Sequence, residues 1–146
     1  MVQQNQSGGI RFHMARRTLA GLLWLALLCW ACGILVLSSL TPQELPDAAF
    51  LFWDKANHFL AYALGGWLAA RALRVSRPSV GIAAAAILAI IMIAAFGALD
   101  ELLQTFTPGR SGGDILDWTA DLLGAIAGAV VSLLTYARLE RLLRRP

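Results

Sequence analysis

The most regular feature of the sequence is an alternation between long apolar stretches and short polar connections. The apolar stretches cover residues 18–40, 56–73, 80–99 and 116–136. A helix of about 20 residues, rising 1.5 Å per residue, crosses the roughly 30 Å hydrocarbon core of a bilayer. The second stretch is shorter and carries polar side chains, so its assignment depends on the charges that flank it. The pattern predicts an all-α, polytopic membrane protein with a bundle of four transmembrane helices.

Basic and acidic residues occur on alternate connections, and this alternation predicts the orientation. Ten of the twelve Lys and Arg residues precede the first stretch, follow the second or follow the fourth: Arg11, Arg16, Arg17, Arg71, Arg74, Arg77, Arg138, Arg141, Arg144 and Arg145. Eight of the nine acidic residues lie in or beside the other two connections: Glu44, Asp47, Asp54, Asp100, Glu101, Asp114, Asp117 and Asp121. Because basic residues favour the cytoplasmic side, both termini are predicted to be cytoplasmic.

Composition supports the membrane assignment, since 58% of the residues are hydrophobic and only 14% are charged. The basic ends are interpreted as topology anchors, and no nucleic-acid partner is expected. Residues 1–13 are predicted to be a disordered tail or an added expression sequence, which leaves residues 14–146 as one membrane domain. A cleaved signal peptide is the alternative for the first stretch, but the run exceeds the usual length of about 7 to 15 residues.

Polar side chains recur at helical spacing beside three of the apolar stretches. Lys55, His58 and Tyr62 are spaced i, i+3 and i+7 and therefore share a helix face. The same spacing relates Asp114, Asp117 and Asp121, whereas Glu101 and Gln104 continue a stripe that carries Gly97. The predicted topology brings all three faces to the extracytoplasmic end, with Arg110 in a glycine-rich loop above them.

We expect these faces to converge on one polar cavity, because an ionisable group inside a membrane costs at least about 2.5 kcal/mol and persists when paired or hydrated. The predicted ligand-binding residues are Lys55, His58, Tyr62, Glu101, Gln104, Arg110, Asp117 and Asp121. The structural alternative is that the charges only neutralise one another at helix ends, where aspartates also favour a helix N-terminus.

The ordered motifs of this region resemble those of the VanZ-like family of small bacterial membrane proteins. They are Lys55-x-x-His58-x-x-x-Tyr62, Asp100-Glu101-x-x-Gln104-x-x-x-Pro108-Gly109-Arg110 and Asp114-x-x-Asp117-x-x-x-Asp121-x-x-Gly124-x-x-x-Gly128. The family takes its name from a member associated with resistance to the glycopeptide teicoplanin. The resemblance implies a multi-pass protein of the bacterial cytoplasmic (inner) membrane. Asp121 departs from the Asn that is more usual there, which adds negative charge.

Two functions are compatible with these residues. In the first, the outward cavity binds an amphiphilic or peptidoglycan-related ligand and alters glycopeptide susceptibility, with Lys55 and Arg110 holding an anionic group and the aromatic segment 50–53 holding the apolar part. In the second, an intramembrane enzyme acts on a lipid-linked substrate, and the catalytic candidates are His58, Glu101 and Asp117.

A related version of the enzyme function includes a divalent metal, because imidazole and carboxylates are competent ligands. The candidate metal ligands are His58, Glu101, Asp117 and Asp121. Gly124 and Gly128 form a small-xxx-small pair, which supports either a homo-oligomer or helix packing within one chain.

Overall fold

The computed structural model describes the backbone of residues 3–45, 54–110 and 112–143, and side-chain contacts within 14–45, 54–110 and 112–136. This part of the chain folds into helices only: α1 (Gln3–Ser39), α2 (Asp54–Ser76), α3 (Ile82–Gln104) and α4 (Ile115–Leu143). The predicted all-α class is confirmed. Helix α1 extends into residues 3–13, which the sequence predicts as a tail, and the predicted aromatic segment 50–53 lies outside the described residues.

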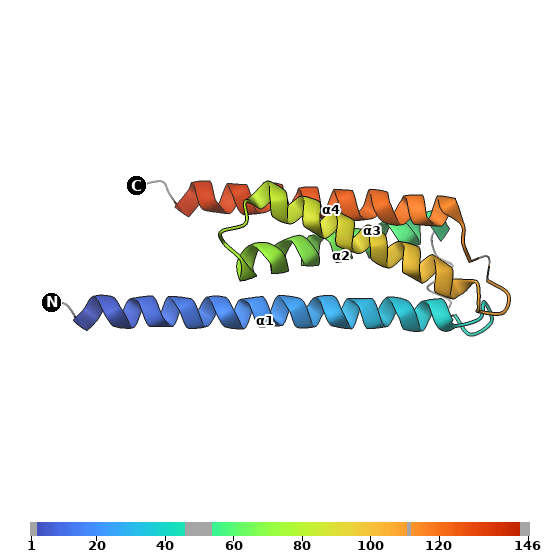
Figure 1. Ribbon diagram of the computed structural model, residues 1–146, viewed down its shortest axis with the longest axis horizontal. Coiled ribbons are helices and arrows are strands. Elements are labelled where there is room, and N and C mark those ends of the chain that lie inside the picture. The colour runs from blue at the N-terminus through green and yellow to red at the C-terminus, as the bar shows by residue number, and fades with distance from the viewer. Residues whose placement is uncertain (1–2, 46–53, 111, 144–146) are drawn as a thin grey trace.

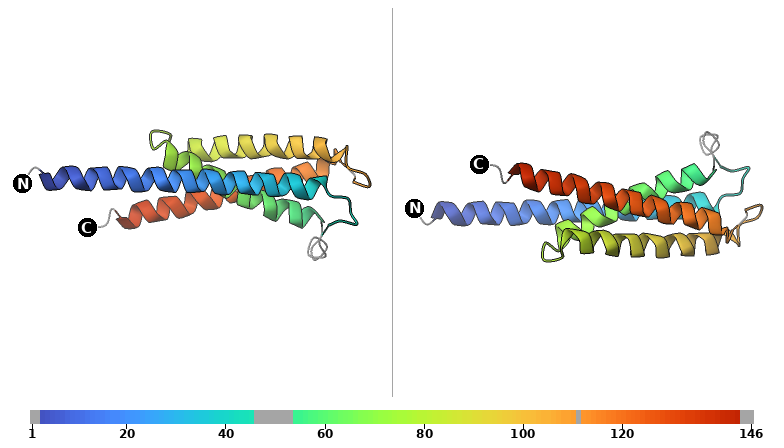
Figure 2. Two further views of the ribbon diagram at one scale, coloured as in Figure 1. Left: turned by 90° about the horizontal axis from the view of Figure 1, so that it is seen from below. Right: turned by 90° about the horizontal axis from the view of Figure 1, so that it is seen from above.

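The four helices run along one long axis, as the three views in Figures 1 and 2 show. Helix α2 packs most extensively on α4, whereas α1 packs mainly on α2. The start of α1, the turn between α2 and α3 and the end of α4 lie at one end of the molecule. The end of α1, the start of α2 and the loop between α3 and α4 lie at the opposite end, which we call the loop end.

Three helical segments are long and apolar enough to cross a membrane, namely Met14–Ser39, Ile82–Gln104 and Ile115–Tyr136. Large apolar side chains on these segments are exposed, among them Leu22 at 58% and Ile91 at 61%. Apolar exposure on this scale is expected where lipid, rather than water, surrounds the helices. The chain is therefore a membrane protein.

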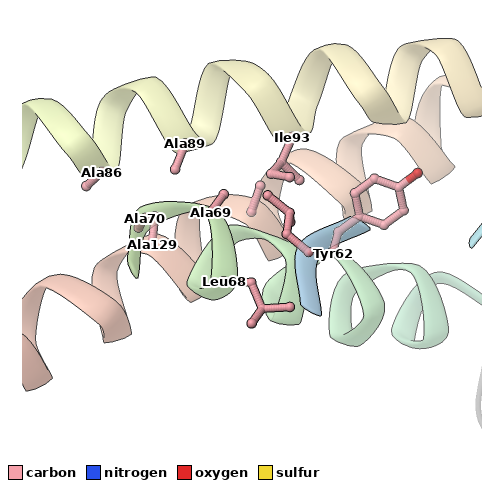
Figure 3. Close-up of a cluster of buried hydrophobic side chains, with 10 residues drawn as sticks. Tyr62, Leu68, Ala69, Ala70, Ala86, Ala89, Ile93 and Ala129 are labelled. Carbon is pink, nitrogen blue, oxygen red and sulfur yellow. The ribbon is translucent and has the colours of Figure 1, made fainter. Parts of the chain in front are cut away.

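Small residues form much of the helix interface. Ala69, Ala89 and Ala129 are fully buried in the apolar cluster that Figure 3 shows, with Tyr62 at its edge and the tyrosine hydroxyl pointing away from the other side chains. At Gly124 and Gly128, a Cβ atom would overlap the backbone of α2 at Phe59 and Ala63, respectively. The small-xxx-small pair is therefore used for packing within the chain.

Helix α3 continues beyond the predicted apolar stretch, which ends at residue 99, and includes three polar residues: Asp100, Glu101 and Gln104. All three are buried, because Ser38 of α1, Tyr62 of α2 and the Asp114 amide before α4 supply hydrogen-bond partners that a hydropathy pattern does not reveal. This extension carries the polar face of α3 into the loop end of the bundle.

Candidate functional site

Lys55, in the first turn of α2, joins α2 to the start of α4. Its Nζ donates to Asp117 and lies 3.1 Å from Oδ2 of Asp114. Asp117 is buried, whereas the Asp114 side chain is 30% exposed. Hydrogen bonds from the Leu116 amide and from Lys55 lower the pKa of Asp114, which lies just before α4. Lys55 is therefore held by two carboxylates.

His58, one turn further along α2, faces Asp121 of α4. The Nδ1 atom of His58 lies 2.9 Å from Oδ1 of Asp121, whose side chain is fully buried. Gly97 of α3 provides the space, because a Cβ atom there would lie 3.0 Å from Oδ2 of Asp121 and 3.1 Å from the Tyr62 ring. Three helices therefore meet around this histidine–aspartate pair.

Glu101 links α3 to the loop that precedes α4. Its Oε2 accepts a hydrogen bond of 3.0 Å from the backbone amide of Asp114, and its carbonyl accepts one of 3.1 Å from Gly113. Gly113 has a φ of 78°, in the left-handed region that favours glycine. The glycine-rich loop thus folds back on the end of α3 and brings Asp114 and Asp117 beside Lys55.

Asp100 is the centre of a second buried polar group. Its Oδ2 accepts hydrogen bonds from Ser38 at 2.9 Å, Tyr62 at 3.2 Å and Gln104 at 3.2 Å. Sequence reasoning did not select Ser38 or Asp100 as site residues. The spacing of Asp100 from Gly97 and Gln104, at i−3 and i+4, places it on the same polar face, but the contact with Ser38 depends on the packing of α1.

A cavity of about 580 Å³ opens at the loop end beside this polar group. Its polar wall includes His58, Tyr62, Asp100 and Gln104, and the lining also contains apolar residues of α1 and of the connection that follows it: Ile34, Leu37, Pro42 and Leu45. Polar and apolar lining on different helices gives the cavity an amphiphilic character.

Arg110 lines the cavity from the loop between α3 and α4. Its Nη2 donates a hydrogen bond of 2.8 Å to the carbonyl of Leu37, near the end of α1. Thr107 of the same loop donates to the carbonyl of Ser38 at 3.1 Å. The sequence predicts that Arg110 caps the acidic residues, but within the described contacts it binds the exposed end of α1 and thereby ties the loop to that helix.

The eight predicted ligand-binding residues all lie at the loop end, in two adjoining groups. The cavity is lined by His58, Tyr62, Gln104 and Arg110, whereas Lys55, Glu101, Asp117 and Asp121 lie among the ion pairs beside it. His58 belongs to both groups. Among the described residues, two sets of side chains have atoms close enough together to hold a metal ion: Asp54, His58 and Asp117, and His58, Glu101 and Asp121.

Comparison with known proteins identifies the family. A sequence model described as VanZ/LLP1 matches residues 22–136, which include most of the four helices and the whole polar site. Neither a curated protein nor a solved structure gives a significant match to the chain.

Proposed function

The chain belongs to the VanZ/LLP1 family, and from that premise we propose that it is a cell-envelope protein whose cavity binds an amphiphilic or peptidoglycan-related ligand. The observation that carries the proposal is the cavity itself, which has a polar wall next to apolar side chains of α1. An amphiphile presents the same two chemistries, a polar head and an apolar chain, so both parts could be satisfied at the boundary of the membrane.

Lys55 and Arg110 differ in what they offer such a ligand. Lys55 is held by Asp114 and Asp117, so an anionic group would have to compete with two carboxylates for it. Arg110 lines the cavity and contacts a single backbone carbonyl through Nη2. Arg110 is therefore the cation that we propose contacts a phosphate or carboxylate of the ligand.

A bulky side chain in the cavity should weaken binding. Ala61 lines the cavity, and the larger side chain of tryptophan at this position would occupy part of its volume. We expect Ala61→Trp to weaken the binding of a fluorescent lipid-linked peptidoglycan precursor in detergent by at least about tenfold, equivalent to about 1.4 kcal/mol. Arg110→Ala should weaken it as well.

Leu64→Trp is the matched control, because Leu64 lies one turn away on the same helix and is 51% exposed. It adds the same ring to the outer face and should leave the Kd unchanged. Equal binding by wild type, Ala61→Trp and Arg110→Ala would contradict the proposal. If the protein modulates glycopeptide resistance, cells that express Ala61→Trp should also lose any change in teicoplanin susceptibility that the wild type confers.

A second candidate function is catalysis on a lipid-linked substrate, favoured by the contact of His58 with buried Asp121 at the edge of the cavity. A carboxylate that orients an imidazole is a recurring arrangement in general-base catalysis. The same binding experiment distinguishes the two functions when the recovered precursor is analysed by mass spectrometry: a changed mass that requires His58 indicates chemistry, and an unchanged mass indicates binding alone.

We also propose that α2 spans the bilayer together with the three more apolar helices, in a bacterial cytoplasmic membrane with both termini inside. The start of α1 and the end of α4 lie at the same end of the molecule, as this topology requires (Figure 1). The alternation of basic and acidic connections supports the direction.

Cysteine labelling in intact cells tests this topology. After Cys29 and Cys32 are replaced by serine, a cysteine near Gly109 should react with a membrane-impermeant maleimide, and a cysteine inserted after Arg141 should react only once the cells are opened. The opposite labelling pattern would mean that the orientation is the reverse of the one proposed. Labelling of both positions in intact cells would mean that the number of spans is not even.

A further inference from the structure

We propose that His58, Glu101 and Asp121 form a binding site for a divalent transition-metal ion such as Zn²⁺. The three residues come from α2, α3 and α4, and each offers one ligand atom within 4.8 Å of the other two. One imidazole and two carboxylates leave a fourth coordination position open in a tetrahedral site. The sequence offers four candidate ligands, and the packing of the helices distinguishes among them.

The first support comes from buried oxygens without a partner. Oε1 of Glu101 and Oδ2 of Asp121 are buried and accept no hydrogen bond from the described residues. The two residues are only 4% and 0% exposed, respectively. A buried carboxylate oxygen without a donor is unfavourable, and a bound cation is one way to satisfy it.

The spacing of the donor atoms also fits a small cation. In a tetrahedral site, two atoms that are each about 2.1 Å from Zn²⁺ lie about 3.4 Å apart, so donor atoms within 4.8 Å of one another need to approach by at most about 1.4 Å. The separation of 2.9 Å between His58 Nδ1 and Asp121 Oδ1 is about 0.5 Å shorter than this spacing, so these two atoms would move slightly apart around the ion. The ion would replace the proton of this hydrogen bond, because a metal-bound nitrogen must be unprotonated.

The other set, Asp54, His58 and Asp117, is a poorer site. The ammonium group of Lys55 already binds Asp117, so a cation there would meet a positive charge in direct contact with one of its ligands. The Asp54 side chain is 63% exposed, and water solvates its charge. Electrostatics therefore favours His58, Glu101 and Asp121, which we call the inner set. Lys55 neutralises the aspartates of the outer set, which consists of Asp54, His58 and Asp117.

The charge balance of the loop end points the same way. Helix α3 brings buried Asp100 and Glu101, and α4 brings buried Asp117 and Asp121, to a region whose described ion pairs involve only Lys55 and His58 as cations. Arg110 lies at the same end, but its described hydrogen bond is to the Leu37 carbonyl. Excess buried negative charge is costly in a membrane domain unless protons or cations bind. A divalent ion bound to Glu101 and Asp121 offsets two of these charges, on the two residues that also carry the unpartnered oxygens.

Metal binding by the tag-free, full-length protein in detergent tests the inference. After removal of metals with EDTA, Zn²⁺ should bind with a stoichiometry of one and raise the unfolding temperature by at least about 5 °C at saturation, because the ion binds the folded state. Mg²⁺ at the same concentration should have a much smaller effect, since it prefers oxygen ligands in octahedral geometry. Failure of the wild type to bind Zn²⁺ would overturn the inference.

Substitutions locate the ion. Glu101→Gln, Asp121→Asn and His58→Ala should each reduce the Zn²⁺ stoichiometry to near zero, whereas His13→Ala removes the other histidine of the chain and should retain one ion. Asp54→Asn should also retain it. Loss of Zn²⁺ in Asp54→Asn but not in Glu101→Gln would place the ion in the outer set and reject the inner one.

The amide substitutions also distinguish a bound metal ion from a proton that the side chains of the same site share. Gln and Asn resemble protonated acids in shape, so they should leave a proton-sharing site about as stable as before and should remove only the stabilisation that Zn²⁺ provides. The inference does not rest on the proposed ligand, because stoichiometry and unfolding are measured without it. If only this inference is wrong, the protein binds the precursor but not Zn²⁺. If only the proposed function is wrong, it binds Zn²⁺ but not the precursor.

Discussion

Gly128→Ala should prevent α4 from packing on α2 and should greatly reduce the amount of folded protein. A Cβ atom at this position would overlap the carbonyl group of Ala63 and approach the amide of Trp67, which are backbone atoms of α2 and cannot rotate away. The two helices would have to separate along their most extensive interface. Overpacking of this kind costs about 1–3 kcal/mol where side chains can adjust, and we expect more here because backbone must move.

Gly33→Ala on α1 is the matched control, since a Cβ atom at Gly33 has no neighbour within 4 Å among the described atoms. It should leave the folded fraction unchanged or slightly higher, because alanine is the better helix former. The measurement is the monodisperse fraction after extraction, together with the unfolding temperature in detergent. Equal yields and unfolding temperatures for the two variants would show that α2 and α4 pack less closely than the structure describes.

Lys55→Met should destabilise the protein by about 3 kcal/mol, because it leaves buried Asp117 without its cation. Removal of one member of a buried ion pair typically costs about 3–5 kcal/mol, and we choose the lower end because the Lys55 side chain is 19% exposed. Methionine keeps much of the length and the apolar stem of lysine, so the change isolates the charge. Unfolding followed by denaturant or heat in detergent measures the loss.

The double variant Lys55→Met, Asp117→Asn should recover most of this stability, since it removes both members of the pair. Asp114, the other partner of Lys55, is partly exposed and can be solvated when the lysine is absent. A double variant as unstable as Lys55→Met would mean that Lys55 contributes through the packing of its stem rather than through its charge. Such a result would also weaken the view that Lys55 neutralises the outer aspartates.

Hydropathy predicted the number and approximate positions of the helices, because apolar residues in a membrane protein must be continuous over the thickness of the bilayer. Hydropathy was least accurate at the ends of the helices. The apolar stretch ends at residue 99, but helix α3 continues to Gln104, as the helical spacing of Gly97, Glu101 and Gln104 predicted, and Asp100 and Gln104 are hydrogen-bonded to each other and to Ser38. Partners on another helix permit polar residues to remain helical and buried, and hydropathy averages cannot include them.

Helical spacing predicted which polar side chains share a face, and the structure brings these faces together. Lys55 contacts Asp117, His58 contacts Asp121 and Tyr62 contacts Asp100. Spacing did not predict that Arg110 binds the end of α1 through the Leu37 carbonyl, because that contact joins residues 73 positions apart. For the same reason it did not reveal that Ser38 of α1 belongs to the polar group around Asp100.

The sequence by itself determined the helical class, the membrane environment, the family motifs and the faces on which polar residues lie, because these follow from local periodicity and composition. Tertiary structure alone decided the division of the polar residues into a cavity wall and an ion-pair cluster, and it assigned Gly124 and Gly128 to contacts within the chain. These features depend on which helices are neighbours and how closely they approach. Pairing of charges across helices is energetically important in lipid, yet no spacing along one helix specifies it.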